Sequence, residues 1–379
     1  MELIERNHCV ISGKEDLELL YSFRNFPVFL GCVDHPQEED IGEDMNWWIS
    51  RSTGSLQLNP LIPLEILYSQ SHGSGSTGRL WQQHHGEFAE FLFKHKVRNA
   101  LEIGAGNGIL AKNYMNMVSD VDWTIVEPNP AIEPQKNIHV IRGIFDNNFS
   151  LDRQIDAIIH SHVLEHVYSP MEFFTAIDRF LSIGQMHLFS VPRLEVMLER
   201  KYTNCINFEH TIFLTEPFIE FLLDANGFKV IEKSYFLDDH SIFYAAQKQN
   251  SNRGTEAVPN QYEKNKRLFN DYILFHQDLI ADLRKKINSY KGKVYLFGGH
   301  VFSQYLLGFG LDENKIECIL DNDPAKQGKR LYGTSLLVRS PKILASEKDP
   351  VVILRSGVYN QEIKEDITGN VNPKVIFWE

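Results

Sequence analysis

Cysteine is scarce in this chain. Its 379 residues hold four cysteines, Cys9, Cys32, Cys205 and Cys318, and none of them forms a C-x-x-C pair. Scattered cysteines lack both the ligand spacing of a zinc motif and the density of a disulfide-stapled secreted domain. We therefore expect reduced thiols and a cytoplasmic protein.

Positive charge and long apolar runs are also lacking. Lys and Arg number 38 against 50 Asp and Glu, which gives a net charge of -12 with no long basic block. Proteins that bind nucleic acid neutralise phosphates with clustered positive charge, so we expect no nucleic-acid partner. No apolar run approaches the roughly 18 residues of a membrane helix. The start, Met1 to Glu5, has no basic or apolar signal region, so neither a membrane segment nor a signal peptide is expected.

Short apolar segments that alternate with amphipathic ones are plentiful. This pattern is typical of a parallel sheet with helices on both faces, so the predicted fold class is α/β. A final antiparallel hairpin is expected from residues 229–236 and 240–247. The expected helices lie at 80–94, 108–118, 171–181 and 215–228, and the expected strands at 99–104, 123–128, 138–143, 156–161 and 185–192.

The chain divides into three parts on composition. Residues 1–66 hold few periodic segments and predict a small irregular module, and residues 67–250 form the α/β core. The polar stretch 248–261 is the clearest linker. Residues 251–379 comprise this linker, a long helix over 262–290 and a second α/β unit that begins with the glycine turn Gly298-Gly299.

The first glycine turn, in LEIGAGNG (101–108), predicts a cofactor site. Its glycines, Gly104, Gly106 and Gly108, permit a tight turn and a close approach of the backbone to a ligand. A dinucleotide fingerprint G-x-G-x-x-G needs glycine where Ile109 stands. The carboxylate of Glu102, just before the turn, would repel a pyrophosphate but suits the ammonium of a methionine moiety.

Residues after the next strands favour S-adenosylmethionine as the cofactor. Glu127 ends the second strand, where a carboxylate accepts hydrogen bonds from two ribose hydroxyls. After the third strand, Phe145 could stack on the adenine or simply belong to the core, and Asp146 could accept from its amino group. Ser161, His162, Glu165 and His166 follow the fourth strand, which faces the transferable methyl group. An NAD site remains the alternative.

The whole chain resembles the sugar C-methyltransferases that act on nucleotide-linked deoxysugars. The resemblance rests on LEIGAGNG, on residues 207–232, on 294–307 and 337–341, and most specifically on D-x-x-P-x-K-Q-G at Asp321 to Gly328. It implies a class I methyltransferase Rossmann-like core, preceded by a small zinc module and followed by a Rossmann-like domain that shapes the substrate cleft. It also implies a Glu-His pair, here Glu209-His210, and a His-Gly-Gly-Ser segment, here loosely His240-Ser241. Tyr68, Ser74 and His84 occupy places near the sugar and the cofactor, although a linker is the alternative for this Gly/Ser-rich stretch.

The N-terminal part departs from this family. Two cysteine pairs are expected there, but the positions read Cys9, Ser12, Ser50 and Thr53. Tetrahedral structural zinc needs Cys or His ligands. We therefore predict no bound metal and a module held together by packing.

Methyl transfer requires a base that removes a proton from the acceptor. His210 is the first candidate because imidazole titrates near neutral pH; Glu209 would orient it, and His240 is the second candidate. His166 is assigned to the substrate side. The predicted function is transfer of a methyl group from S-adenosylmethionine to a nucleotide-activated sugar or a related polysaccharide or natural-product building block. The alternatives are O- or N-methylation of another small molecule, an NAD-dependent sugar oxidoreductase, and a retired cofactor-binding scaffold. The oligomeric state is left open.

Overall fold

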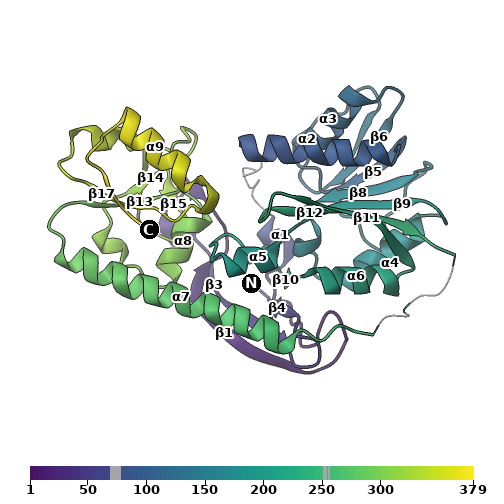
Figure 1. Ribbon diagram of the computed structural model, residues 1–379, viewed down its shortest axis with the longest axis horizontal. Helices are drawn as coiled ribbons and strands as arrows, with labels where there is room; N and C mark the ends of the chain where they lie inside the picture. Colours follow the sequence, from purple (N-terminus) through teal and green to yellow (C-terminus); the bar gives the residue numbers. More distant parts are fainter. Residues whose placement is uncertain (69–77, 251–253, 255–256) are drawn as a thin grey trace.

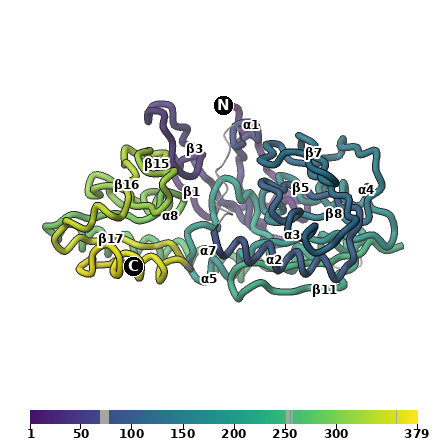
Figure 2. The backbone as a smooth tube through the Cα atoms, turned by 90° about the horizontal axis from the view of Figure 1, so that it is seen from above, coloured from purple at the N-terminus to yellow at the C-terminus, as the bar shows by residue number. Residues whose placement is uncertain are grey.

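The computed structural model describes residues 1–68, 78–250, 254 and 257–379. Two α/β lobes lie side by side, with the first strands of the chain between them (Figure 1). Seen from above, the N-terminal segment again separates the lobe that contains β5 and β8 from the lobe that contains β16 and β17 (Figure 2).

The sheet of the central lobe has the strand order β11-β12-β9-β8-β5-β6-β7 in the described part of the chain. All neighbouring pairs from β9 to β7 are parallel, and β12 runs antiparallel to both β9 and β11. This confirms the α/β class and the expected hairpin. The strands are β5 (Asn99–Ile103), β6 (Asp122–Glu127), β7 (Ile138–Arg142), β8 (Ala157–Ser161), β9 (Met186–Pro192), β11 (Phe228–Phe236) and β12 (Ser241–Lys248).

Helices cover both faces of this sheet (Figure 1). On one face, α2 (Arg79–Lys94) and α3 (Ile109–Met117) bury Phe88 and Leu110 against the strands. On the other face, α4 (Pro170–Phe180) and α6 (Glu216–Ala225) bury Phe174 and Leu222. A sheet buried on both faces explains the nearly continuous apolar runs of β6 and β8.

The second lobe is a smaller parallel sheet with the order β16-β14-β13-β17-β18 in the described residues. The long helix α7 (Tyr262–Ser289) leads into it, within one residue of the range expected from its apolar spacing. The remaining elements are β13 (Val294–Phe297), α8 (Val301–Gly308), β14 (Ile319–Leu320), β15 (Arg330–Leu331), β16 (Val338–Arg339), β17 (Val351–Ile353), α9 (Asn360–Asn370) and β18 (Ile376–Trp378).

The N-terminal region is a sheet, so the expectation of an irregular module is wrong. β1 (Leu17–Pro27) and β3 (Gly42–Ser50) form a long antiparallel pair, which β4 (Leu56–Leu58) and β10 (Ile212–Phe213) extend. Two register shifts interrupt the β1–β3 pairing, and Asn25 has a left-handed φ of 48°. Such bulges break the alternation of apolar and polar residues that marks a strand in sequence. Because β10 comes from the central lobe, this sheet is shared between distant parts of the chain.

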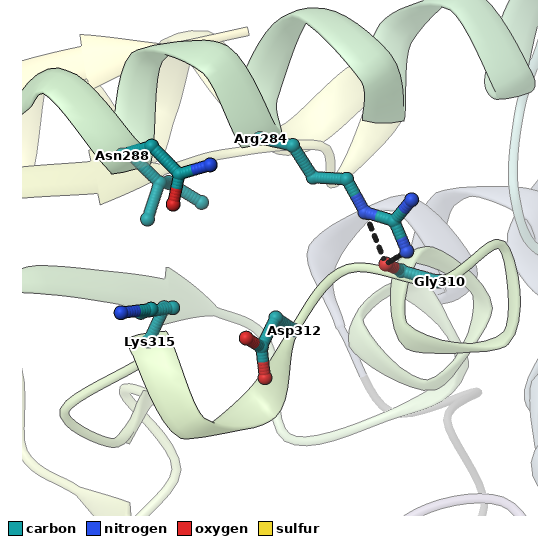
Figure 3. A pocket seen from close by; sticks show the side chains of 6 residues that line it. Arg284, Asn288, Gly310, Asp312 and Lys315 are labelled. Atoms are coloured by element: carbon teal, nitrogen blue, oxygen red, sulfur yellow. Dashed lines mark hydrogen bonds between the residues drawn. The ribbon is translucent and has the colours of Figure 1, made fainter.

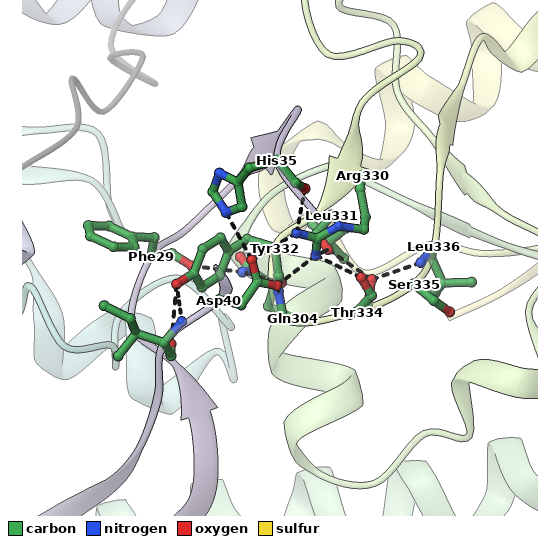
Figure 4. Close-up of polar contacts among 12 residues, drawn as sticks. Phe29, His35, Asp40, Gln304, Arg330, Leu331, Tyr332, Thr334, Ser335 and Leu336 are labelled. Carbon is green, nitrogen blue, oxygen red and sulfur yellow. Dashed lines mark hydrogen bonds and ion pairs between the residues drawn. The ribbon is translucent and has the colours of Figure 1, made fainter. Parts of the chain in front are cut away.

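A buried ion pair fastens the N-terminal segment to the second lobe (Figure 4). The Arg330 guanidinium donates to both carboxylate oxygens of Asp40 at 2.6 and 2.8 Å, and also to the His35 and Thr334 carbonyls. Nearby, β2 (Cys32–Val33) pairs with β15. Burial alone would raise the pKa of Asp40, but its hydrogen bonds with Arg330, the Gly333 N–H and His35 lower that pKa below its usual value.

The glycine turn of the second lobe is filled by the protein itself. The Cys32 thiol donates to the Gly299 carbonyl at 3.1 Å, and the Gly299 N–H donates to Asp321 at 2.8 Å. A β-carbon on Gly299 would lie 2.9 Å from the Cys32 sulfur. This turn therefore packs against the N-terminal segment in the position where a nucleotide site would need open space.

Two short helices and one cavity complete the described fold. The short helices α1 (Leu64–Leu67) and α5 (Leu194–Glu199) flank the central lobe. A cavity of about 370 Å³ opens between α7 and residues 310–315, where Arg284 donates to the Gly310 carbonyl (Figure 3). This cavity lies in the second lobe and is separate from the first glycine turn.

Within the described residues, no helix is both long enough and apolar enough to cross a membrane.

Replacing Asp40 by asparagine tests the buried ion pair. Asp40→Asn leaves the Arg330 charge buried without its partner, so we expect a loss of roughly 3 kcal/mol of unfolding free energy, measured by urea denaturation. Since the pKa of Asp40 is depressed in the folded state, the pair stabilises the protein at neutral pH, and this stabilisation is lost as the pH falls through the folded pKa.

The exposed ion pair Arg24–Asp44 supplies the matched control, because Arg24 is 80% exposed. Arg24→Gln should change the unfolding free energy by less than about 1 kcal/mol. Equal effects of the two substitutions would contradict a special role for the buried pair.

Candidate active site

The first glycine turn joins β5 to α3 through left-handed backbone. Gly104, Gly106 and Gly108 have φ values of 72°, 53° and 63°. A β-carbon on Gly104 would lie 2.6 Å from the side chain of Val163, whereas one on Gly106 would meet nothing within 4 Å. Glycine at 104 is thus required by packing against the segment after β8, and the turn leaves open space above Gly106 for a ligand.

Glu127 lies at the end of β6 and faces this turn. Its carboxylate accepts the backbone N–H groups of Gly106 at 3.2 Å and Asn129 at 3.1 Å. A carboxylate oxygen has more than one lone pair, so these bonds fix the side chain and leave capacity to accept ribose hydroxyls. The predicted ribose role of Glu127 remains a prediction.

Glu102 is buried beneath the turn, with 3% of its surface exposed. Its Oε2 accepts the indole N–H of Trp123 at 2.7 Å. Burial, opposed by this hydrogen bond and reinforced by the charge of Glu127, raises the pKa of Glu102 to about 7. The carboxyl is therefore poised between its two forms near neutral pH, and a nearby ammonium group would favour the ionised form.

The predicted adenine edge follows β7. Phe145 is 6% exposed and its ring packs against Phe149, Phe173 and Phe180. Little of this ring is left to stack on a purine, which favours the core alternative for Phe145. The neighbouring Ile144 is 53% exposed and offers more free apolar surface than Phe145. Asp146 accepts the Asn148 N–H at 2.8 Å and otherwise faces solvent.

The end of β8 carries strained and unsatisfied groups. His162 has a φ of 53°, a left-handed conformation that is uncommon outside glycine, although asparagine, aspartate and histidine adopt it more often than other residues. The hydroxyl of Ser161 is buried and has no hydrogen-bond partner among the described residues. Strain and unpaired polar atoms persist at functional sites because a ligand or reaction uses them.

His84, His162 and His240 form a histidine cluster. It lies where α2 meets the end of β8, the end of β9 and the start of β12. The His84 Nε2 is 2.9 Å from the Ser190 hydroxyl, and His162 Nε2 and His240 Nδ1 are 2.8 and 2.6 Å from the Ser241 hydroxyl. The Trp81 ring packs edge-on against all three imidazoles. Burial, with added repulsion from the neighbouring imidazoles, lowers the pKa of His84 and sets that of His240 at about 3, so both are neutral at neutral pH.

A carboxylate cluster, made of Glu165, His166 and His210, lies on the other side of His162. Their ligand-capable atoms all lie within 4.8 Å of one another. Glu165 and His166 belong to the short 3-10 helix η3 (Leu164–His166), and His210 precedes β10. The Tyr68 hydroxyl lies 3.4 Å from His166 Nδ1. The pKa of Tyr68 is raised by burial first and then by the charge of Glu209.

In the structure, the predicted residues therefore form two groups. Tyr68, His166, Glu209 and His210 come together around Glu165, while His84 and His240 lie with His162. Ser74 lies outside the described residues. Sequence reasoning missed Trp81 and the second histidine of the pair, His85, whose buried Nδ1 has no partner among the described residues. The spacing W-x-x-H on one helix face was the signal that could have revealed Trp81.

Comparisons with known proteins agree with this geometry. Residues 79–233 match the family model described as a methyltransferase domain. A search of the curated proteins finds no match.

Similar solved structures include three bacterial methyltransferases. An S-adenosylmethionine-dependent methyltransferase from Clostridium acetobutylicum is 11% identical, with a TM-score of 0.35 over 45% of this chain and 92% of that one. The 1,6-didemethyltoxoflavin-N1-methyltransferase of Burkholderia thailandensis is 15% identical, with a TM-score of 0.40 over 54% and 96%. The N-methyltransferase NodS from Bradyrhizobium japonicum is 15% identical, with a TM-score of 0.35 over 46% and 99%.

The strand order, the glycine turn and the matched domain define a class I methyltransferase. The protein is an S-adenosylmethionine-dependent methyltransferase, and S-adenosylmethionine is its cofactor. This result favours S-adenosylmethionine over the NAD-dependent alternative.

The pKa of Glu102 gives a test of its predicted contact with the cofactor ammonium. If the ionised form binds the ammonium, affinity for S-adenosylhomocysteine rises between about pH 6 and pH 8 as Glu102 loses its proton. Glu102→Gln should weaken binding by roughly tenfold and flatten this pH dependence. Isothermal titration calorimetry measures both effects.

The exposed Glu90 on α2 supplies the control, since Glu90→Gln should leave affinity and pH dependence unchanged. A pH dependence that survives in Glu102→Gln would assign it to another group.

Proposed function

We propose that this methyltransferase acts in the cytoplasm on a nucleotide-activated sugar, or on a related building block of a polysaccharide or natural product. The observation that carries the proposal is the assembly around Glu165. The family resemblance singles out Tyr68 and Glu209-His210, which are far apart in the sequence, and both reach His166. Their hydroxyl, carboxylate and imidazole groups suit an acceptor rich in oxygen atoms.

The N-terminal sheet supports the same subfamily. The Cys9 thiol lies 3.4 Å from the Thr53 hydroxyl and 3.4 Å from the Ser12 nitrogen. Burial would raise the pKa of Cys9, but hydrogen bonds from Ser12, Ser50, Ser55 and Thr53 lower it. The four positions where the family has cysteines are thus gathered around one point, with hydroxyl groups in place of three thiolates.

The chemistry needs a proton acceptor beside the methyl acceptor. S-adenosylmethionine supplies a methyl group on a positively charged sulfur, which leaves as a neutral thioether. The acceptor atom loses a proton to a base, and the freed electron pair forms the new bond to the methyl carbon as the carbon–sulfur bond breaks.

Two histidines are the candidates for this general base. His210 presents Nε2, because its Nδ1 lies 2.9 Å from the Cys205 carbonyl and donates to it. His240 presents Nε2 as an acceptor in the tautomer in which its Nδ1 donates to the Ser241 hydroxyl. Desolvation favours the neutral, proton-accepting form of both. Sequence ranks His210 first, and we propose that one of these two histidines takes the proton.

Transfer of a labelled methyl group tests the proposal. The full-length protein is incubated with S-adenosylmethionine carrying a carbon-13 methyl and a panel of nucleotide sugars and keto-sugars. We expect a new methyl signal by NMR, whose chemical shift reports a carbon-, oxygen- or nitrogen-bound product. The base should be the histidine whose change to glutamine lowers kcat by roughly a hundredfold or more, with S-adenosylhomocysteine affinity retained.

Transfer only to acceptors that are not sugars would reject the sugar substrate. Tight cofactor binding with no transfer to any acceptor, and no effect of His210→Gln or His240→Gln except on stability, would support a retired scaffold.

Restoring the cysteines tests the subfamily resemblance separately. In the triple variant Ser12→Cys, Ser50→Cys and Thr53→Cys, four thiolates surround one point, so we expect one additional zinc ion per chain by elemental analysis. The double variant that leaves Ser12 in place is the control and should bind zinc more weakly. Failure of the folded triple variant to bind the extra zinc would contradict a vestigial zinc site.

A further inference from the structure

Glu165 is a buried carboxylate with an unusual shortage of partners. It is 2% exposed, and neither carboxylate oxygen has a hydrogen-bond partner among the described residues. Three imidazoles surround it: His162 Nδ1 at 3.4 Å, His166 Nε2 at 3.8 Å, and His210, whose ring lies 5.1 Å from that of His166. A buried carboxylate that lacks hydrogen bonds normally requires a cation or a proton.

The two histidines are oriented as metal ligands. His210 donates its Nδ1 proton to the Cys205 carbonyl, which fixes the tautomer with a lone pair on Nε2. His166 Nδ1 lies 3.4 Å from the Tyr68 hydroxyl, and its Nε2 faces Glu165. A hydrogen bond from the remote ring nitrogen to a carbonyl or polar group is the usual support of a metal-binding histidine.

From this arrangement we infer that Glu165, His166 and His210 bind one divalent first-row metal ion. Two imidazoles and one carboxylate are a ligand set that suits manganese, iron, cobalt, nickel or zinc, and they leave coordination positions open for other oxygens. Ligand atoms that share an ion are at most roughly 4.3 Å apart. The ligand atoms of the three residues lie within 4.8 Å of one another, and His166 Nε2 is 3.8 Å from Glu165 Oε1, so the side chains are already near this separation.

The inferred ion deepens the proposed function and rests on it for its role. The open coordination positions of the ion, next to Tyr68 and Glu209, would bind two neighbouring oxygen atoms of the methyl acceptor. An oxygen bound to a divalent ion loses its proton more readily, which favours attack on the methyl carbon. A cation on His210 Nε2 occupies the lone pair that proton transfer needs, so His240 of the histidine cluster becomes the proton acceptor.

Metal binding is tested on the full-length protein without a purification tag. Protein treated with chelator is titrated with Co²⁺ and followed by its visible absorption and by calorimetry. We expect one ion per chain, and a loss of at least about tenfold in affinity in Glu165→Gln and in His166→Gln. Glu172→Gln, the same change at an exposed position of α4, is the matched control and should bind as the native chain does.

The readouts separate this inference from the proposed function. S-adenosylhomocysteine affinity reports folding and the cofactor site in every variant. No Co²⁺ binding in protein that binds S-adenosylhomocysteine, or binding that Glu165→Gln and His166→Gln leave unchanged, would overturn the metal site while the proposed function stands. One bound ion without methyl transfer to any sugar acceptor would uphold the site and reject the sugar proposal. Methyl transfer that chelator does not slow, but that Glu165→Gln slows, would assign Glu165 a proton-relay role and overturn the inferred ion.

Discussion

One buried threonine connects the parts from which the candidate site is built. The Thr211 N–H donates to the Glu165 carbonyl at 2.9 Å, and its hydroxyl donates to the Val167 carbonyl at 2.7 Å. Its own carbonyl accepts the Leu58 N–H from β4 and the guanidinium of Arg6. The segment after β8, the approach to β10 and the N-terminal sheet therefore meet at a single residue, and His210 stands immediately before it.

This connection gives the N-terminal sheet a role beyond stability. In a protein with one α/β lobe, residues at the ends of parallel strands are positioned by the sheet alone. Here the strand ends position the glycine turn, Ser161 and His162, but His210 and Tyr68 depend on segments that the N-terminal sheet holds. Hydroxyl groups surround the Cys9 thiol, and β3 and β4 pair and present the edge to which β10 adds. The sheet is stabilised by packing, because Trp47 and Ile49 are fully buried in its core.

Structural features that depend on neighbouring residues could be predicted from the sequence. Contacts between residues far apart in the chain could not. The α/β class, the glycine turn and helix α7 follow from local periodicity and glycine spacing, and the structure confirms them. The strands β1 and β3 were missed because bulges and a left-handed Asn25 disturb their alternation. The nearness of Tyr68 to His166, which are 98 residues apart, has no local signal. The members of the histidine and carboxylate clusters could each be named from the sequence as candidates. Their division into two clusters could not be predicted, because it depends on the strand end from which each side chain projects.

The attachment of β2 and Asp40 to the second lobe also sets an order of events during synthesis. The central lobe is complete in sequence well before Arg330 emerges, yet Asp40 waits for a partner 290 residues further along the chain. Domains fold largely as they leave the ribosome, N-terminal parts first. The segment around β2 and Asp40 therefore lacks its final contacts until the chain has been made as far as Arg330. A nascent chain stopped after β12 would contain the strands that the described residues contribute to the central and N-terminal sheets, but not the partners of β2 and Asp40. The cofactor turn can therefore form before the contact that joins the N-terminal segment to the second lobe.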